Sequence, residues 1–240
     1  MSMSTLRDLI AYAVQRLPSP LDRLPAEWSR SRFRRRLRQH FLERGPNWSP
    51  QTKVFGIGLS RTGTTSLAHA LQTLGYHTFH WSRNGKVLGW PDFQDIDAAT
   101  DTPCSVQFEA LYHTFDESKF IYTTRAVDDW KKSMKRYFDV ETPGELRTLP
   151  SKRSYWKSEN NWANYNNIRK AQIHECLYAQ HETWESAYQK FDERVHHFFD
   201  DKSNHRFLEM NITDGDGWDV LCRFLGVKPP KKDFPHESRF

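Results

Sequence analysis

The hydrophobic positions from residue 53 onward alternate between short apolar runs and longer stretches with helical spacing. The apolar runs predict buried strands at Lys53–Leu59, Tyr76–Trp81, Ile96–Thr100, Lys119–Thr124 and Arg206–Ile212. Helical spacing predicts helices at Thr65–Leu74, Val127–Phe138 and Trp218–Leu225, and one long helix or a pair between Asn160 and Phe199. Five strands that alternate with helices favour an α/β fold, with a parallel sheet flanked by helices on both faces.

The first 50 residues differ from the rest in their charge. The whole chain has a net charge of +5, of which residues 1–50 carry +6 and the remaining 190 residues −1. This segment holds an apolar helical stretch at Thr5–Leu17 and an arginine-rich helix candidate at Ser29–Arg44, separated by prolines. We therefore predict a basic helical extension over 1–50 and one domain over 51–240. Two interpretations of the extension stay open: it contacts an anionic surface, or it docks on the domain with its arginines in water.

The overall composition excludes several classes of protein. A chain of 240 residues with 37% hydrophobic residues is long enough to bury its own core. Its three cysteines, Cys104, Cys176 and Cys222, are too scattered for a disulfide framework or a zinc site. No apolar run is long enough for a secretory leader or a membrane span, so we expect a cytoplasmic protein.

The strongest local signal lies between the first predicted strand and the helix that follows it. There the chain reads Gly58-Leu-Ser-Arg-Thr-Gly63-Thr-Thr-Ser66. Glycines let the backbone bend so that consecutive N–H groups converge on one anion, and the amino end of the helix adds a favourable potential. The segment therefore predicts a phosphate-binding loop, and its five hydroxyl side chains argue against a purely structural turn.

Position 64 separates this loop from that of the nucleotide hydrolases. Their pattern, Gly-x4-Gly-Lys-Ser/Thr, requires a lysine there to reach the terminal phosphates, and this chain has Thr64. The fixed cation within the loop is Arg61 instead. We therefore expect the loop to bind a phosphate without the usual lysine, which disfavours ATP or GTP hydrolysis.

A second signal follows the fourth predicted strand. Arg125 is expected at the carboxyl end of that strand, and Ser133 one to two turns into the next helix. A guanidinium group and a hydroxyl from two elements suit a second phosphate. Taken alone this signal is weak, because an arginine at the end of a strand is often a structural ion-pair residue.

Together the two segments resemble the sulfotransferases that use 3′-phosphoadenosine 5′-phosphosulfate (PAPS). The segment from Ser60 to Thr65 is similar to the family's 5′-phosphosulfate loop, with Arg61 at the position of its lysine. Arg125 and Ser133, eight residues apart, match its 3′-phosphate motif. The tail from Gly217 to Val227, followed by Pro235, is similar to the bacterial branch, whereas the glycine-rich third motif is absent.

The resemblance implies a three-layer P-loop fold, with the donor at the carboxyl ends of the strands. It implies PAPS as the donor, adenosine 3′,5′-bisphosphate as the product and no metal. The residues that it implies for cofactor binding are Ser60, Arg61, Thr62, Gly63, Thr64, Thr65 and Ser66 at the 5′-phosphosulfate, and Arg125 and Ser133 at the 3′-phosphate.

Sulfuryl transfer needs a cation at the departing oxygen and a base for the acceptor. Arg61 is the candidate cation. For the base there are two candidates, Asp101 and His80. Asp101 lies in Thr100-Asp-Thr-Pro103, where many relatives have Thr-His-x-Pro, and it would need a pKa raised by burial. His80 ends the second predicted strand and has an ordinary pKa nearer neutrality; we favour Asp101 slightly.

The predicted function is sulfuryl transfer from PAPS to a hydroxyl or amine of a small-molecule, lipid or carbohydrate acceptor. Two alternatives stay open, a nucleotide or nucleoside kinase-like enzyme and a non-catalytic anion-binding protein. We expect no nucleic-acid partner. Neither the acceptor nor the oligomeric state follows from the sequence, since one scaffold serves many acceptors.

Overall fold

The computed structural model describes residues 52–148, 163–202 and 204–236. The predicted extension over 1–50 lies outside the described residues, so this division of the chain stays a prediction. One compact unit comprises Gln51–Gly89 and Ile96–Phe240, and the short helix α4 (Trp90–Asp95) falls outside it.

The larger unit is built on a parallel sheet of five strands. The strands are β1 (Val54–Gly56), β2 (Thr78–His80), β5 (Ala98–Thr100), β6 (Lys119–Thr123) and β7 (Phe207–Met210). Their order across the sheet is β2-β5-β1-β6-β7, and every neighbouring pair is parallel. All five predicted strands are confirmed, each shorter than its apolar run, and the α/β class with them.

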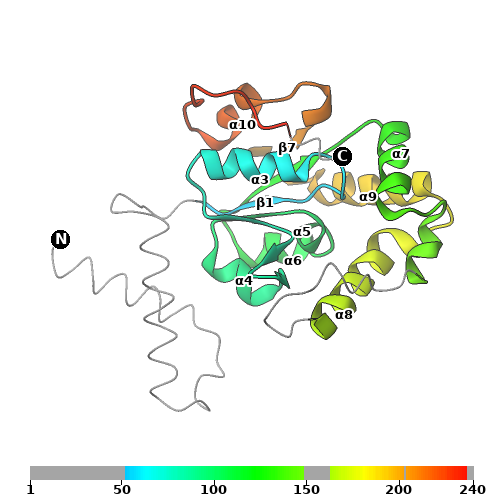
Figure 1. Cartoon of the computed structure of the whole chain (residues 1–240). Coiled ribbons are helices and arrows are strands. Elements are labelled where there is room, and N and C mark those ends of the chain that lie inside the picture. The colour runs from blue at the N-terminus through cyan, green and yellow to red at the C-terminus, as the bar shows by residue number, and fades with distance from the viewer. Residues whose placement is uncertain (1–51, 149–162, 203, 237–240) are drawn as a thin grey trace, which may run out of the picture. The chain divides into compact units, whose positions relative to one another are not determined.

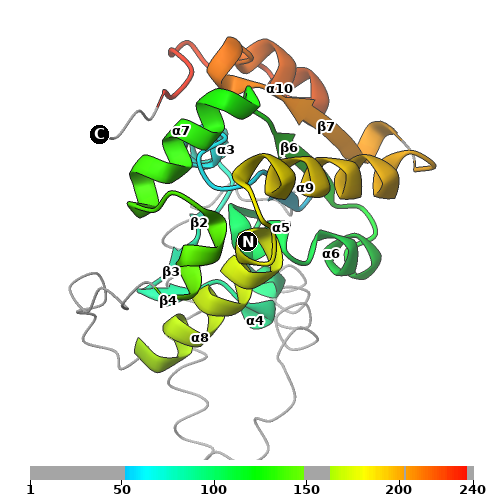
Figure 2. The same cartoon turned by 90° about the vertical axis from the view of Figure 1, so that its right-hand side faces the viewer.

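Helices cover both faces of the sheet (Figures 1 and 2). They are α3 (Thr64–Thr73), α5 (Thr102–Ser105), α6 (Phe108–Thr114), α7 (Val127–Phe138), α8 (Ala163–His174), α9 (Trp184–Phe199) and α10 (Trp218–Leu225). Shorter turns are the 3-10 helices η2 (Pro143–Arg147), η5 (Asn204–Arg206) and η6 (Ile212–Asp214), and the π-helix η4 (Glu175–Ala179).

Alternate residues of each strand supply the two halves of the core. Val54 and Ile121 point to one face, where they pack with Leu71 of α3 and Leu221 of α10. On the opposite face the core is aromatic: Phe55 and Phe120 have ring centres 5.5 Å apart. There, Phe207 stacks on Phe199 of α9 at 4.2 Å, and Tyr112 of α6 joins the same layer. Figure 1 accordingly shows α3 and α10 on one side of β1, and α5 and α6 on the other.

Two features of the fold were not predicted, and a third decides between the predicted alternatives of one long helix and a pair. The segment between β5 and β6 forms α5 and α6. A hairpin of β3 (Ser82–Arg83) and β4 (Lys86–Val87) follows β2, turning through Asn84 and Gly85, both with positive φ. The helical region that ends at Phe199 is interrupted: α8 leads into η4, and α9 begins only at Trp184, after a capping box formed by Thr183 and Ser186.

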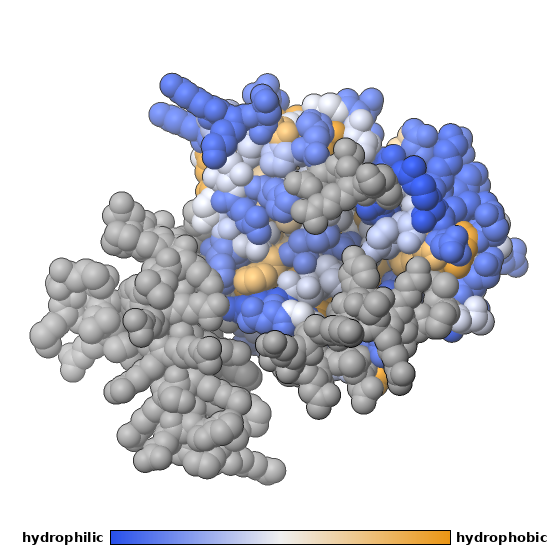
Figure 3. All heavy atoms as spheres, in the orientation of Figure 1, coloured by the Kyte–Doolittle hydropathy of each residue, from blue (hydrophilic) through white to orange (hydrophobic). Residues whose placement is uncertain are grey.

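The face seen in Figure 3 is largely hydrophilic, and its hydrophobic colour is confined to small, separate patches. Among the described residues, the large apolar side chains with the greatest exposure are Ile168, at 60%, and Tyr137, at 49%. In the described part of the chain, no helix combines the length and apolar character needed to cross a membrane.

Candidate active site

The predicted site residues gather at one edge of the sheet, where the parallel strands end. His80 ends β2, Asp101 follows β5 directly, and Arg125 lies two residues beyond β6. The loop that follows β1 leads into α3 on one face, whereas the chain after β5 enters α5 toward the other. Open α/β sheets bind ligands in the crevice that such opposite connections create.

The loop after β1 is closely packed. A Cβ atom on Gly58 would lie 2.6 Å from the Thr123 backbone oxygen and 1.9 Å from the Thr123 hydroxyl, so only glycine fits. The buried Thr62 hydroxyl bonds with the Leu59 carbonyl and with the Thr123 hydroxyl, each at 2.7 Å. Ser105 donates to the Gly58 carbonyl at 2.7 Å. These contacts fix the bend of the backbone before the helix begins.

Ser60 is bound through all of its polar groups. Its N–H donates to the hydroxyl of Tyr178 at 3.0 Å, and its carbonyl accepts from the Trp130 indole N–H at 2.8 Å. Its hydroxyl donates to Asp101 Oδ1 at 3.2 Å. Ser60 therefore links the loop to α7, η4 and the residue after β5.

The amino end of α3 has no side-chain cap among the described residues. Gly63, at the N-cap position, has a left-handed backbone with φ of 101° and supplies no side chain to the helix. The first N–H groups of any α-helix lack an intrahelical acceptor, so those of Thr64 and Thr65 are available to an anion. This end of α3 is therefore suited to bind a phosphate or sulfate group.

Positive charge is concentrated beside the loop. Arg125 donates from Nη1 to the Arg61 carbonyl at 3.2 Å, and its buried Nε has no hydrogen-bond partner among the described residues. Arg61 donates from Nε to the buried hydroxyl of Ser133, on α7, at 3.1 Å. Burial lowers the pKa of Arg61, and the neighbouring charge of Arg125 adds to this effect. Two close guanidinium groups with a buried, unpartnered donor indicate a site for an anion.

His80 and Asp101 meet at the other end of the site. The His80 Nε2 atom lies 3.4 Å from Asp101 Oδ2 and 3.2 Å from the Thr65 hydroxyl, and Nδ1 lies 3.0 Å from the Thr100 hydroxyl. Burial lowers the pKa of His80, although the charge of Asp101 opposes the shift, so the ring is neutral at pH 7. The two candidate bases form one pair.

The backbone of Asp101 is strained. Its φ of 81° and ψ of −178° fall in a region populated almost only by glycine. Such conformations cost about 1–3 kcal/mol and persist where the surrounding structure enforces them, often at functional sites. Of the two residues, Asp101 is therefore the one whose backbone conformation the surrounding structure must enforce.

Comparison with known proteins identifies the family. A sequence model of the sulfotransferase domain matches residues 53–88 and 91–239. The chain belongs to the sulfotransferase family. A protein of Aspergillus versicolor named "Ava biosynthesis cluster protein M" is 26% identical over 214 residues, which cover 77% of this chain and 80% of the relative. The matched region of this sulfotransferase includes both anion-binding segments and the His80–Asp101 pair.

The sequence did not indicate which residues support the sulfotransferase site. Trp130 lies in the helix predicted over Val127–Phe138, but no residue pattern near it indicates its contact with Ser60. Tyr178 and Tyr188 contact backbone groups that are 118 and 63 residues away in the sequence. Within the described ranges, no group of three or more His, Cys, Asp or Glu side chains is placed to hold a metal ion.

Proposed function

We propose that this sulfotransferase uses PAPS as its donor and transfers the sulfuryl group to a hydroxyl or amine of the acceptor. The observation that carries the proposal is the pairing of two anion sites of different construction at one edge of the sheet. One is the uncapped amino end of α3, suited to the 5′-phosphosulfate. The other contains Arg125, with its unpartnered Nε, and Ser133, and is suited to the 3′-phosphate.

The donor fits these residues better than a nucleoside triphosphate does. Bound PAPS supplies an activated sulfuryl group and carries a 3′-phosphate that ATP lacks. The loop has Thr64 where a kinase-type loop places the lysine that reaches the β- and γ-phosphates. In contrast, Arg125 has a buried donor that an additional phosphate would satisfy.

Arg61 is positioned between the two anion sites. Its backbone belongs to the loop, and its side chain reaches Ser133. Because a guanidinium group stays charged even when burial lowers its pKa, Arg61 can stabilise negative charge that develops on the departing oxygen. It cannot readily donate a proton to that oxygen, unlike a lysine.

We propose Asp101 as the base that accepts the proton of the acceptor, with His80 as its partner. Asp101 already accepts from Ser60 through Oδ1, while Oδ2 faces the neutral imidazole of His80. The strained backbone holds this carboxylate at the sheet edge.

A binding titration tests the donor assignment. Adenosine 3′,5′-bisphosphate should bind without metal and more tightly than ATP with Mg²⁺. Removal of the 3′-phosphate, as in 5′-AMP, should weaken binding by about 10-fold or more, because a charge-assisted hydrogen bond contributes about 1.5–3 kcal/mol. Equal affinity for the bisphosphate and 5′-AMP would exclude the assigned role of Arg125 and Ser133.

A further inference from the structure

A buried aromatic cluster lies beside both anion sites. Its members are Trp130 of α7, Tyr178 of η4, and Trp184 and Tyr188 of α9. The ring centres of Trp130 and Tyr188 are 5.0 Å apart, and Trp130 and Trp184 meet edge to face at 5.9 Å. Two parts of the chain that are distant in the sequence, α7 and the region of η4 and α9, therefore share one packed unit.

The polar ends of this cluster bond to backbone atoms of the two anion-binding segments. Tyr178 accepts from the Ser60 N–H and Trp130 donates to the Ser60 carbonyl, so both hold the loop. Tyr188 accepts from the Arg125 N–H at 3.1 Å and donates to the Arg125 carbonyl at 2.9 Å. Each anion-binding segment is thus fixed by a different tyrosine.

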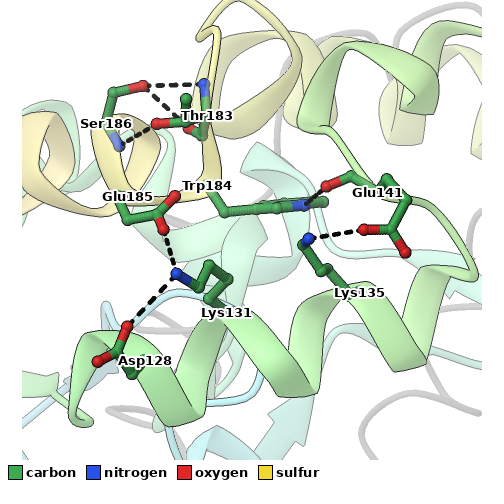
Figure 4. Close-up of polar contacts among 8 residues, drawn as sticks. All are labelled: Asp128, Lys131, Lys135, Glu141, Thr183, Trp184, Glu185 and Ser186. Atoms are coloured by element: carbon green, nitrogen blue, oxygen red, sulfur yellow. Dashed lines mark hydrogen bonds and ion pairs between the residues drawn. The ribbon is translucent and has the colours of Figure 1, made fainter.

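Local structure places both tyrosines. Tyr178 lies in a π-helix, whose extra residue per turn changes the direction of the side chains that follow, and such insertions are frequent at functional sites. Tyr188 lies one turn into α9. The amino end of α9 contacts α7 through the ion pair between Glu185 and Lys131, and Lys131 also pairs with Asp128 of its own helix (Figure 4). The Trp184 indole donates to the carbonyl of Glu141, in the segment after α7. Contacts between α7 and α9 therefore fix the position of the aromatic cluster.

We propose that Tyr178 and Tyr188 are positioning residues that fix the two anion-binding segments separately, and that together they set the spacing at which the protein recognises a ligand with two phosphates. This inference rests on the proposed function. Tyr178 is fully buried and Tyr188 is 6% exposed, so neither is available to touch the ligand, and each acts through a backbone.

The division of roles predicts a change in ligand selectivity. Loss of the Tyr188 hydroxyl should loosen only the Arg125 segment, which is assigned to the 3′-phosphate. Loss of the Tyr178 hydroxyl should loosen the loop, which is assigned to the 5′-phosphate. That phosphate is present in both adenosine 3′,5′-bisphosphate and 5′-AMP. A single hydrogen bond contributes about 0.5–1.5 kcal/mol, which corresponds to a change of about 2- to 10-fold in affinity.

The experiment is isothermal titration of wild type, Tyr178→Phe and Tyr188→Phe with adenosine 3′,5′-bisphosphate and with 5′-AMP. Tyr188→Phe should weaken binding of the bisphosphate by about 5-fold and leave 5′-AMP within about 2-fold. Tyr178→Phe should weaken binding of both ligands by similar factors. The matched control is Tyr76→Phe, which removes a hydroxyl from a buried tyrosine at the opposite edge of the sheet, before β2 begins, and should change neither affinity.

The outcomes separate this inference from the proposed function. If the wild type does not bind the bisphosphate in preference to 5′-AMP, the proposed function fails. If it does, but Tyr188→Phe weakens both ligands equally or neither, the positioning inference is wrong. Thermal unfolding establishes that each variant is folded; should a phenylalanine variant not fold, Trp130→Phe tests the loop and Tyr188→His tests the Arg125 segment with the same ligand ratio.

Discussion

The proposed site has two halves, named here for the donor and the base that we assign to them, and the fold builds them in different ways. The donor half, comprising the loop from Gly58 to Gly63 and the Arg125 segment, is fixed by buried hydroxyl and indole groups that bond to its backbone. The base half consists of His80 and Asp101, which meet at 3.4 Å and depend on a strained backbone at Asp101. Packing thus fixes the donor half, in which Arg61 has a left-handed φ of 73°, whereas the base half contains the more strained backbone, with φ of 81° and ψ of −178° at Asp101.

The difference between a packed donor half and a strained base half corresponds to a difference in role, between binding the donor and catalysing the transfer. A rigid, well-packed donor half presents N–H groups and guanidinium groups without rearrangement, as a binding site requires. The base half needs a carboxylate in a position that an unstrained backbone would not give it. The free-energy cost of this strain is offset by favourable interactions elsewhere in the fold. Substitutions in the donor half should therefore affect stability and binding, and at Arg61 also the rate of transfer, whereas substitutions in the base half should affect mainly the rate.

The largest expected effect is on the rate of transfer. Asp101→Asn keeps the size of the side chain and removes its basicity, so the rate should fall by about 100- to 10,000-fold, the usual contribution of general acid–base catalysis. Affinity for adenosine 3′,5′-bisphosphate should stay within about 2-fold of wild type, because the side-chain oxygen of asparagine can still accept the hydrogen bond from Ser60 of the donor loop. Transfer is measured by the gain of sulfate mass on an acceptor identified by screening with PAPS.

His80→Asn and Asp97→Asn complete this test. Asp97 is a buried aspartate at the amino end of β5, where it accepts from the His77 N–H, so its substitution should lower stability and not the rate of transfer. If His80→Asn abolishes transfer while Asp101→Asn retains it, the base is His80. Wild-type rates in both variants would contradict the assignment of the base to this pair.

The next largest effect concerns the stability of the donor half. In Gly58→Ala the new methyl group would meet the Thr123 backbone oxygen at 2.6 Å, and the sheet cannot move away freely. We expect a loss of about 2–3 kcal/mol in the free energy of unfolding, measured with urea. Gly144→Ala is the control, since nothing lies within 4 Å of its new Cβ, and it should change stability by less than about 0.5 kcal/mol. Equal stability of the two variants would contradict the close packing of the loop.

The strands and the two anion-binding segments could be predicted from the sequence, because the residue patterns that indicate them are local. The strands and the helix over Val127–Phe138 follow from apolar spacing, and parallel strands bring their carboxyl ends together. The placement of Arg125 and Ser133 near one loop is therefore predictable. The donor half could be located from consecutive residues alone.

The supports of the site could not be predicted, because they depend on how helices rotate against one another. The π-helix at Glu175–Ala179 changes the direction of Tyr178, and no residue pattern indicates that insertion. The base half was ambiguous for a related reason. The sequence offered Asp101 and His80 as rivals, and only the pairing of β2 with β5 shows that they are neighbours.

A smaller effect is expected on the pH dependence of the free energy of unfolding, through His174. His174 packs against Phe138 at 5.0 Å and Tyr178 at 6.0 Å, under the donor half. Burial, with a smaller contribution from the charge of Lys170, lowers the pKa of His174 to about 3. Histidine in an unfolded chain titrates near pH ~6.5, so between these values the unfolded state binds a proton that the folded state does not. The free energy of unfolding should therefore fall as the pH drops below about 7.

The variant His174→Gln measures this contribution. From pH 7 to pH 5.5 the wild type should lose about 1 kcal/mol more stability than the variant, as followed by urea unfolding at each pH. Above about pH 7.5 histidine is neutral in both states, so the two curves should run parallel there and serve as the internal control. Parallel curves across the whole range would show that His174 is protonated equally in the folded and unfolded states.

The smallest effect has the opposite sign and tests the strain of the base half. Asp101→Gly relieves a conformation that costs about 1–3 kcal/mol, but glycine also raises the entropy of the unfolded chain, at about 0.5–1 kcal/mol. The loss of the hydrogen bond from Ser60 reduces the gain further. The net expectation is an increase of about 0.5–1 kcal/mol in the free energy of unfolding, together with loss of transfer. Asp101→Asn is the matched control, since it retains the positive φ and the strain while removing the charge. If both variants have the same stability, strain at residue 101 does not distinguish the two halves, and the base half is as relaxed as the loop beside it.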